Sequence, residues 1–210
     1  MPWPMVHFAI SEMLFDGNPT PDLLLGSIAP DAVHVRGQIS REEKGATHLV
    51  RNGLLPDKVR IVRQFIAYSS MRPEPAWKDF VLGYFSHIYT DVSWTNTLYA
   101  DFERECAGAE AGAGEGNLRR IYNEEVSQIE FEIQRTRDAR IMLERLSTAT
   151  GFALKPLVTR EEVVAYGRQK SEWLNDPSQE PRIQPIYFTV QKVNSFIKET
   201  AAEMKELFLA

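Results

Sequence analysis

The spacing of apolar residues is the feature of this sequence that most restricts its fold. Apolar side chains recur every three or four positions through most of the 210 residues, which is the period of an α-helix with one face turned to a core. Strict alternation of apolar and polar residues, which a half-buried strand requires, extends over no appreciable length. The sequence therefore predicts an all-α fold, with one domain over residues 1–210 and about six or seven helices.

Prolines, glycines and capping residues give the expected limits of these helices. The stretch 76–105 is expected to be helical with a bend near residues 91–96, and Thr159 is a typical N-cap for a later helix. Residues 35–55 are polar and contain glycine, which favours a loop with about one helical turn. The segments predicted to be helical are 4–16, 22–28, 56–69, 76–105, 118–146, 159–174 and 186–209.

A low-complexity segment divides the chain into two parts. Alanine and glycine dominate residues 107–117, which predicts a mobile loop. Most residues suited to chemistry precede this segment. We therefore expect residues 1–105 to hold the metal ligands and residues 118–210 to supply packing helices.

Composition excludes several classes of protein. Hydrophobic residues make up 43% and charged residues 25%, the balance of a soluble globular chain. No apolar run approaches the ~20 residues that span a membrane, and the N-terminus lacks the regions of a secretory signal, so we expect a cytoplasmic protein without a transmembrane segment. The net charge of −5 argues against stable binding of nucleic acid. The single cysteine, Cys106, excludes an internal disulfide and a cysteine-rich zinc site.

A histidine and an aspartate share one face of a predicted helix. Phe80, Tyr84, His87 and Asp91 are spaced by four, three and four positions, so they lie in one stripe. His87 and Asp91 stand one turn apart and can both reach a single metal ion. Because the stripe is otherwise apolar, an aspartate there is costly unless it is paired or bound to a metal. A buried His–Asp hydrogen bond without an ion is the alternative.

Other candidate ligands are spread over the first half of the chain. Asp31 and His34 follow an apolar run that ends at Pro30, a place where ligands are commonly held rigidly. Aspartate after proline is also a common N-cap, and this alternative stays open. His48 lies in a polar stretch and His7 on the first predicted helix. Taken alone, they fit a surface histidine and a hydrogen-bonded core histidine better than metal ligands.

All four histidines lie within the first 87 residues, interleaved with two aspartates and no cysteine. Mixed histidine and carboxylate ligands suit a catalytic divalent metal with open coordination positions rather than a closed structural zinc site. Zinc is the ion expected first, in one or two copies, and manganese, iron and cobalt suit the same ligands.

Four motifs carry a family resemblance: PWPMVH at 2–7, LGSIAPDAVH at 25–34, TH at 47–48 and FVLGYFSHIYTD at 80–91. Over roughly residues 2–95 the chain resembles the prokaryotic zinc-dependent phospholipase C family, an all-α fold related to fungal zinc nucleases. The resemblance implies two metal positions: one zinc ion held by Asp31, His48, His87 and Asp91, and a second position begun by His7 with Asp91 bridging. The family's third zinc uses a His-x-x-x-Glu motif on a following helix, and no histidine follows His87 here.

A glutamate on the helix predicted after residue 118 is a partial substitute for that motif. Glu125 falls within an apolar face that includes Ile121 and Ile129. It is therefore a candidate extra ligand or general base, and a partly exposed glutamate at the edge of the face is the alternative.

Basic residues are locally enriched near the candidate ligands. Between residues 35 and 63 there are seven basic residues and three acidic ones, in a chain that is acidic as a whole. Arg36, Arg41 and Lys44 are the candidates for orienting an anionic phosphate ester, and an ordinary solvated face is the alternative.

The leading hypothesis is a metal-dependent hydrolase that cleaves a small anionic phosphoester or a phospholipid-like substrate with metal-activated water. Asp31 or Glu125 would take the proton of that water, and His34 would act as a hydrogen-bond partner of Asp31 or as a general acid. One alternative is an analogue of HD-type nucleotide phosphohydrolases, although their His-Asp dipeptide is absent from this sequence. The other is a helical binding or structural protein with a vestigial or structural metal site.

Overall fold

The computed structural model describes residues 3–109 and 115–209, and within these residues it contains ten α-helices and no β-strand. The predicted all-α class is confirmed, whereas the expected number of helices was too low. One hydrophobic core extends from Met5 on the first helix to Phe208 near the C-terminus. The ligand-bearing first half and the later helices therefore share one core.

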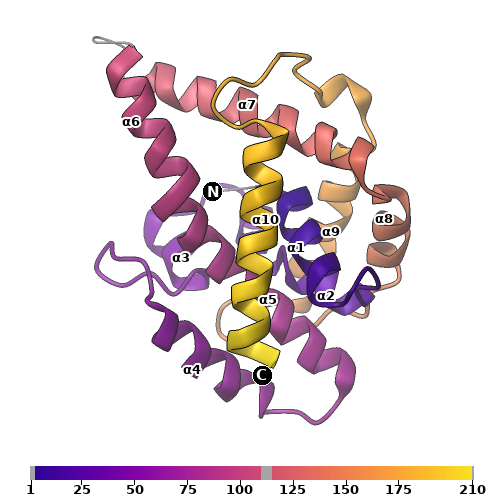
Figure 1. Cartoon of the computed structure of the whole chain (residues 1–210). Coiled ribbons are helices and arrows are strands. Elements are labelled where there is room, and N and C mark those ends of the chain that lie inside the picture. Colours follow the sequence, from indigo (N-terminus) through magenta and orange to yellow (C-terminus); the bar gives the residue numbers. More distant parts are fainter. Residues whose placement is uncertain (1–2, 110–114, 210) are drawn as a thin grey trace.

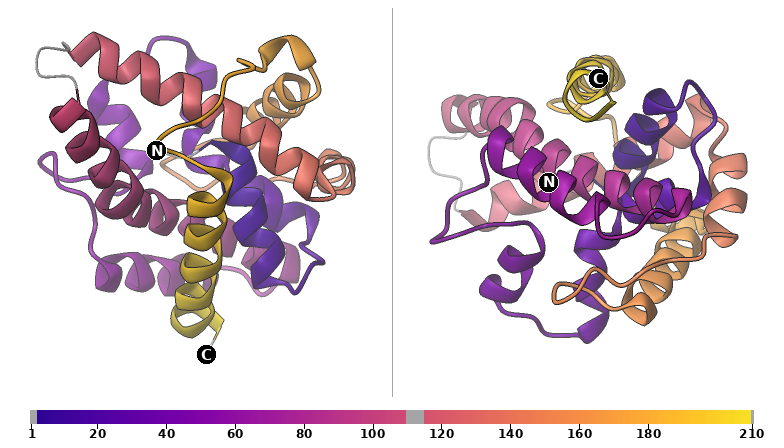
Figure 2. Two further views of the ribbon diagram at one scale, coloured as in Figure 1. Left: turned by 45° about the horizontal axis from the view of Figure 1, so that its top comes forward. Right: turned by 90° about the horizontal axis from the view of Figure 1, so that it is seen from below.

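The centre of the fold is α5 (Pro75–Trp94), which is buried along most of its length. It contacts α1 (Pro4–Leu14), α2 (Pro21–Gly26) and α4 (Lys58–Ser69). The C-terminal helix α10 (Val190–Met204) crosses the outside of α1 and α5 (Figures 1 and 2). Elements from the N-terminal half thus enclose α5, and the last helix closes one side of the assembly.

Two glycines let the backbones of α2 and α5 meet. A Cβ atom added to Gly26 would lie 2.2 Å from the Phe80 carbonyl oxygen, and one added to Gly83 would lie 2.3 Å from the Leu23 carbonyl oxygen. Atoms cannot approach so closely without displacing backbone, so each position accepts only a hydrogen in place of a side chain. This contact brings the end of α2 against the stretch of α5 that carries His87.

The predicted starts and ends of helices agree best with the structure where a capping residue is present. Thr159 caps α9 (Arg160–Leu174) with the expected capping box. The stretch 76–105 is helical as predicted and lies within α5, a π-helical turn (Thr95–Tyr99) and α6 (Ala100–Ala109); the turn overlaps the end of the region where a bend is expected. In the expected loop 35–55, a capping box of Ser40 and Glu43 starts α3 (Arg41–Thr47).

Two predicted helices differ from the structure. The expected helix 118–146 is divided into α7 (Glu115–Thr136) and α8 (Ala139–Ser147), because Asp138 caps a new helix by accepting a hydrogen bond from the backbone of Ile141. The last helix begins at Val190, not at residue 186, since Thr189 is its cap. Of the predicted loop 107–117, both ends are helical, and residues 110–114 lie outside the described part of the chain. No described helix has the length and hydrophobicity needed to cross a membrane.

Candidate metal centre

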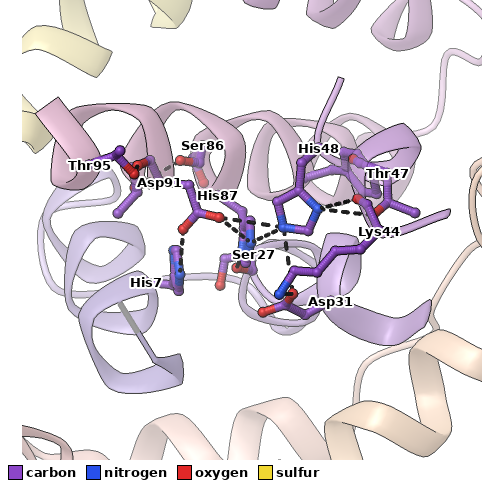
Figure 3. A network of polar contacts seen from close by, with 12 residues as sticks. His7, Ser27, Asp31, Lys44, Thr47, His48, Ser86, His87, Asp91 and Thr95 are labelled. Atoms are coloured by element: carbon purple, nitrogen blue, oxygen red, sulfur yellow. Dashed lines mark hydrogen bonds and ion pairs between the residues drawn. The ribbon is translucent and has the colours of Figure 1, made fainter. Parts of the chain in front are cut away.

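Five of the predicted ligands come together in the interior, carried by four different elements (Figure 3). His7 is on α1, and Asp31 is on a 3₁₀ helix (Ala29–Arg36). His48 is the C-cap of α3, while His87 and Asp91 are one turn apart on α5. We call these five residues the metal cluster. Its histidines and Asp91 are buried, and they form two groups whose ligand atoms are close enough to share a metal ion: His7, His87 and Asp91, and Asp31, His48 and His87.

The spacing of the ligand atoms fits one tetrahedral ion. Nε2 of His48 lies 3.2 Å from Nε2 of His87, and each of these nitrogens lies 3.4 Å from Oδ2 of Asp91. Oδ1 of Asp31 lies 3.5 Å from Nε2 of His48. A regular tetrahedron with zinc–nitrogen and zinc–oxygen bonds of about 2.0–2.1 Å has edges of about 3.4 Å. The four separations given above are therefore close to those around a bound zinc ion.

Backbone carbonyls orient both imidazole rings. Nδ1 of His87 lies 2.8 Å from the Ser27 carbonyl oxygen, and Nδ1 of His48 lies 3.0 Å from the Lys44 carbonyl oxygen. A carbonyl oxygen only accepts hydrogen bonds, so Nδ1 of each ring carries the proton and Nε2 presents a lone pair. Histidine ligands of metals are typically oriented in this way. The Ser27 contact depends on the close packing of α2 against α5 at Gly26 and Gly83.

Several buried polar atoms of the metal cluster have no hydrogen-bond partner among the described residues. They are both ring nitrogens of His7, Oδ1 of Asp31 and both carboxylate oxygens of Asp91. The predicted alternative is a buried His87–Asp91 hydrogen bond; Nε2 of His87 and Oδ2 of Asp91 lie 3.4 Å apart, at the long end of the range for such a bond, and the contact leaves both oxygens of Asp91 without a well-formed hydrogen bond. Leaving buried carboxylate oxygens unpaired is costly, and a divalent ion would supply a partner for carboxylate oxygens of Asp31 and Asp91.

His7 marks a second position beside the first. Its ring stacks on that of His87 with centroids 4.1 Å apart, and its Nε2 lies 3.8 Å from Oδ1 of Asp91. Oδ2 of the same carboxylate faces His48 and His87. The two oxygens of Asp91 thus face different histidines of the cluster, and the bridging role that the resemblance implies stays a prediction.

The pKa shifts of His7, His48 and Asp91 suit metal binding, whereas the shift of His87 opposes it. Burial lowers the pKa of His7 to about 3, with the nearby His87 adding to the effect, and burial also lowers the pKa of His48. Burial acts on His87 in the same direction, but the charge of Asp91 outweighs it and raises the His87 pKa. Burial alone would raise the pKa of Asp91, yet the histidines, His87 foremost, hold it below its usual value. Neutral histidines beside ionised carboxylates are the forms that bind metal.

The structure places two further candidates next to Asp31. Nε2 of His34 lies 3.6 Å from Oδ1 of Asp31, and Nζ of Lys44 lies 3.3 Å from the same oxygen. Both side chains are partly exposed, so they can contact a bound molecule. Asp31 itself is not a helix cap, since the 3₁₀ helix begins after Ile28 without a side-chain cap.

Glu125 does not join the metal cluster. Its carboxylate is buried and accepts hydrogen bonds from the backbone N–H groups of Ile186, Tyr187 and Phe188, at 2.8–3.0 Å. Glu125 therefore anchors the segment before α10. Neither predicted interpretation, a site residue or a partly exposed residue at the edge of the face, included this role. The partner segment is 61 or more positions away in sequence, so no local pattern indicates the contact.

The three predicted substrate-binding cations have different surroundings. Arg36 donates hydrogen bonds to both carboxylate oxygens of Glu162, at 2.7 and 3.0 Å, and also to the Leu157 carbonyl oxygen. It therefore ties the 3₁₀ helix to α9 rather than facing a cavity. Arg41 and Lys44 line cavities beside the metal cluster.

Two cavities have cluster residues in their walls, and Lys44 lines both. The first has a volume of about 200 Å³, and its walls are mainly aliphatic, with Val50, Leu55, Ile88 and Val92 beside His48 and Asp91. The second has a volume of about 440 Å³ and is more polar, with Trp3, Asp31, His34, Asn123, Tyr166, Gln169 and Lys170 in its walls. Sequence reasoning missed Lys170 and Tyr166. Their one local signal is the four-residue spacing that aligns them on α9.

Comparisons with protein-family models, with curated proteins and with solved structures each found no match to this chain. The resemblance to zinc-dependent phospholipase C enzymes therefore rests on the four motifs within residues 2–95. What the described residues themselves establish is an all-α fold with a buried cluster of histidines and aspartates that could hold a metal ion.

Proposed function

We propose that this protein is a metal-dependent hydrolase that cleaves a phosphoester. The observation that carries the proposal is the metal cluster, in which two histidine Nε2 atoms and two aspartate oxygens lie 3.2–3.5 Å from their neighbours, as in a tetrahedral zinc site, and in which the aspartate oxygens have no hydrogen-bond partner. The cluster borders two cavities, so a bound molecule can reach it. A divalent ion held there would supply a water that ionises near neutral pH and would polarise a phosphoryl oxygen.

Three side chains in and around the cluster have separate roles in the proposed reaction. Asp91 holds the two positions in register, because one of its oxygens faces His7 and the other faces His48. Lys44 places its ammonium group beside Asp31, where it can donate hydrogen bonds to a non-bridging phosphoryl oxygen. His34 lies next to Asp31 and is accessible from the polar cavity, so it can deliver a proton to the leaving oxygen.

The first test is metal content and turnover in the same preparation. Protein purified without chelator should contain at least one divalent transition metal per chain. With Zn²⁺, Mn²⁺ or Co²⁺ it should hydrolyse 4-nitrophenyl phosphate or its bis-ester between about pH 6 and 9. Metal-replete protein without turnover on either substrate would contradict the proposal.

Two variants distinguish a metal ligand from a residue that assists turnover without binding the metal. His87→Ala should lose metal and activity together, because Nε2 of His87 is at the centre of the cluster. His34→Ala should keep the metal and lose turnover, because His34 contacts the cluster only through Asp31. Equal metal loss in both variants would show that the assigned roles of these histidines are wrong.

A structural metal site is the second candidate function, and one observation favours it. Asp31, His48, His87 and Asp91 together offer four protein ligands, and closed four-ligand sites are typical of structural zinc. The two functions differ in whether coordination positions stay open for water. A single tightly held ion without bound water, measured by X-ray absorption spectroscopy, would favour the structural role.

A further inference from the structure

The larger, more polar cavity contains a lysine that the metal cluster does not use. Lys170 lies on α9, and the cavity also includes Lys44 and the ligand Asp31 in its walls. The cavity has a volume of about 440 Å³, within the range of pockets that hold small organic ligands. Two lysines thus face one space beside the proposed metal site.

Lys170 has no salt-bridge partner among the described residues. Its ammonium group instead lies over two aromatic rings, 5.1 Å from the Tyr166 centroid and 5.9 Å from the Trp3 centroid. These rings hold the long side chain in place without neutralising its charge. Burial lowers the pKa of Lys170, because an unpaired cation is less stable where it is partly removed from water.

Two carboxyl groups, Asp31 and Glu130, act on the charge of Lys170, and the second of them is mostly not ionised at neutral pH. Glu130 is fully buried on α7 and accepts a hydrogen bond from the backbone of Met5. Burial raises the pKa of Glu130 to about 8, so at neutral pH it is mostly protonated and uncharged. Glu130 therefore does not balance the charge of Lys170.

A bound metal ion would increase the positive charge of this cavity. Asp31 is the carboxylate that faces Lys44, at 3.3 Å. Together Asp31 and Asp91 carry two negative charges, which a divalent ion would balance. Lys44 and Lys170 would then be two uncompensated cations around one cavity. Two like charges repel unless an anion lies between them.

A phosphate monoester matches this arrangement. It carries a charge of about −1.5 to −2 at neutral pH and has three strong acceptor oxygens, whereas a diester carries a single charge. The rest of the cavity wall has aromatic rings and the amides of Asn123 and Gln169, which leaves room for the organic part of the molecule. We propose that this cavity selects phosphate monoesters over diesters and that Lys170 is the specificity-determining residue. The proposal rests on the proposed function, because it assigns the substrate class of the same site.

Calorimetric binding of inorganic phosphate to the zinc-loaded protein tests this inference without turnover. Lys170→Gln should weaken binding of inorganic phosphate by about tenfold or more, because a charge-assisted hydrogen bond is lost. Lys170→Arg should bind more tightly than Lys170→Gln, since it keeps the charge. Lys198→Gln, which removes an exposed lysine on α10 away from the cavity, is the matched control and should bind as the unmodified chain does.

The same titrations with dimethyl phosphate, a monoanion, give the specificity. The unmodified chain should bind inorganic phosphate more tightly than dimethyl phosphate, and Lys170→Gln should remove most of this preference. Equal phosphate affinities for Lys170→Gln and Lys198→Gln, in proteins with the same melting temperature, would overturn the proposal.

The outcome is distinguishable from failure of the proposed function. Phosphate binding that depends on Lys170 in a protein without any turnover would leave the pocket assignment standing and remove the hydrolase. Turnover of both ester classes that does not depend on Lys170 would support the hydrolase and remove the pocket assignment.

Discussion

Replacing Gly83 with alanine should disturb the metal cluster through the backbone. The new Cβ would lie 2.3 Å from the Leu23 carbonyl oxygen and 2.7 Å from the Ser27 backbone nitrogen. Ordinary contact distances begin near 3.4 Å, so α2 and α5 would have to separate by about 1 Å. Both clashing atoms belong to backbone, which cannot rotate out of the way as a side chain can.

The size of the effect follows from two contacts. Overpacking of this kind typically costs about 1–3 kcal/mol of stability. The same movement would lengthen the 2.8 Å contact between the Ser27 carbonyl oxygen and Nδ1 of His87, which orients the ring. Loss of such an orienting partner typically weakens metal affinity by about 10- to 100-fold. We therefore expect Gly83→Ala to lower both the melting temperature and the zinc affinity.

Thermal unfolding and zinc titration against a competing chelator measure the two effects. Gly116→Ala is the matched control, because Gly116 is also helical and a Cβ there would meet nothing within 4 Å. That variant should be neutral, or more stable by up to about 1 kcal/mol, with unchanged zinc affinity. If Gly83→Ala behaved like Gly116→Ala in both measurements, the close approach of α2 and α5 would not set the geometry of the site.

Three further predictions concern buried carboxyl groups. Removing the metal with a chelator should lower the melting temperature, because Asp91 is left buried without a hydrogen-bond partner; an unchanged melting curve after verified metal loss would refute this. Glu125→Gln should destabilise the protein by about 1–3 kcal/mol, measured by denaturant unfolding, and leave metal content unchanged, because the carboxylate holds residues 186–188 and no ligand. The Glu130 pKa is raised from 4.5 to about 8, so the folded state binds this proton more tightly than the unfolded state does. The protonated group therefore adds to the free energy of unfolding. This contribution is complete below about pH 4.5 and is lost as pH rises through about 8. Glu130→Gln should flatten the fall in unfolding free energy between those pH values, and an unaltered pH profile would contradict this assignment.

The metal cluster could be predicted from sequence because part of it is local. His87 and Asp91 are one helical turn apart on an apolar face, and Asp31 follows a proline that ends an apolar run. His7 and His48 carry little signal alone and were assigned only by the family resemblance. The structure brings all five residues together as a cluster that could hold a metal ion, and the division into two metal positions stays a prediction.

The contacts that sequence reasoning missed are long-range. Arg36 and Glu162 are 126 positions apart, and no periodic pattern links them. Lys170 is on a helix with an ordinary amphipathic pattern, and only the fold brings it to the cavity that contains Asp31. The division between α7 and α8 was missed for a different reason, because the capping signal of Asp138 lies within a continuous helical pattern.

The distribution of the ligands over four elements has a consequence for how an ion enters and leaves. His7 and Asp91 are 84 positions apart, so a bound ion would act as a cross-link that closes large loops of the chain. In the unfolded chain the ligands are scattered, and the ion would add stability mainly by penalising that state. His7 and His87 are buried away from both cavities, so full release of an ion must also free it from ligands on α1 and α5. The rate of metal release would therefore depend on local opening of these helices as well as on the lability of the metal–ligand bonds.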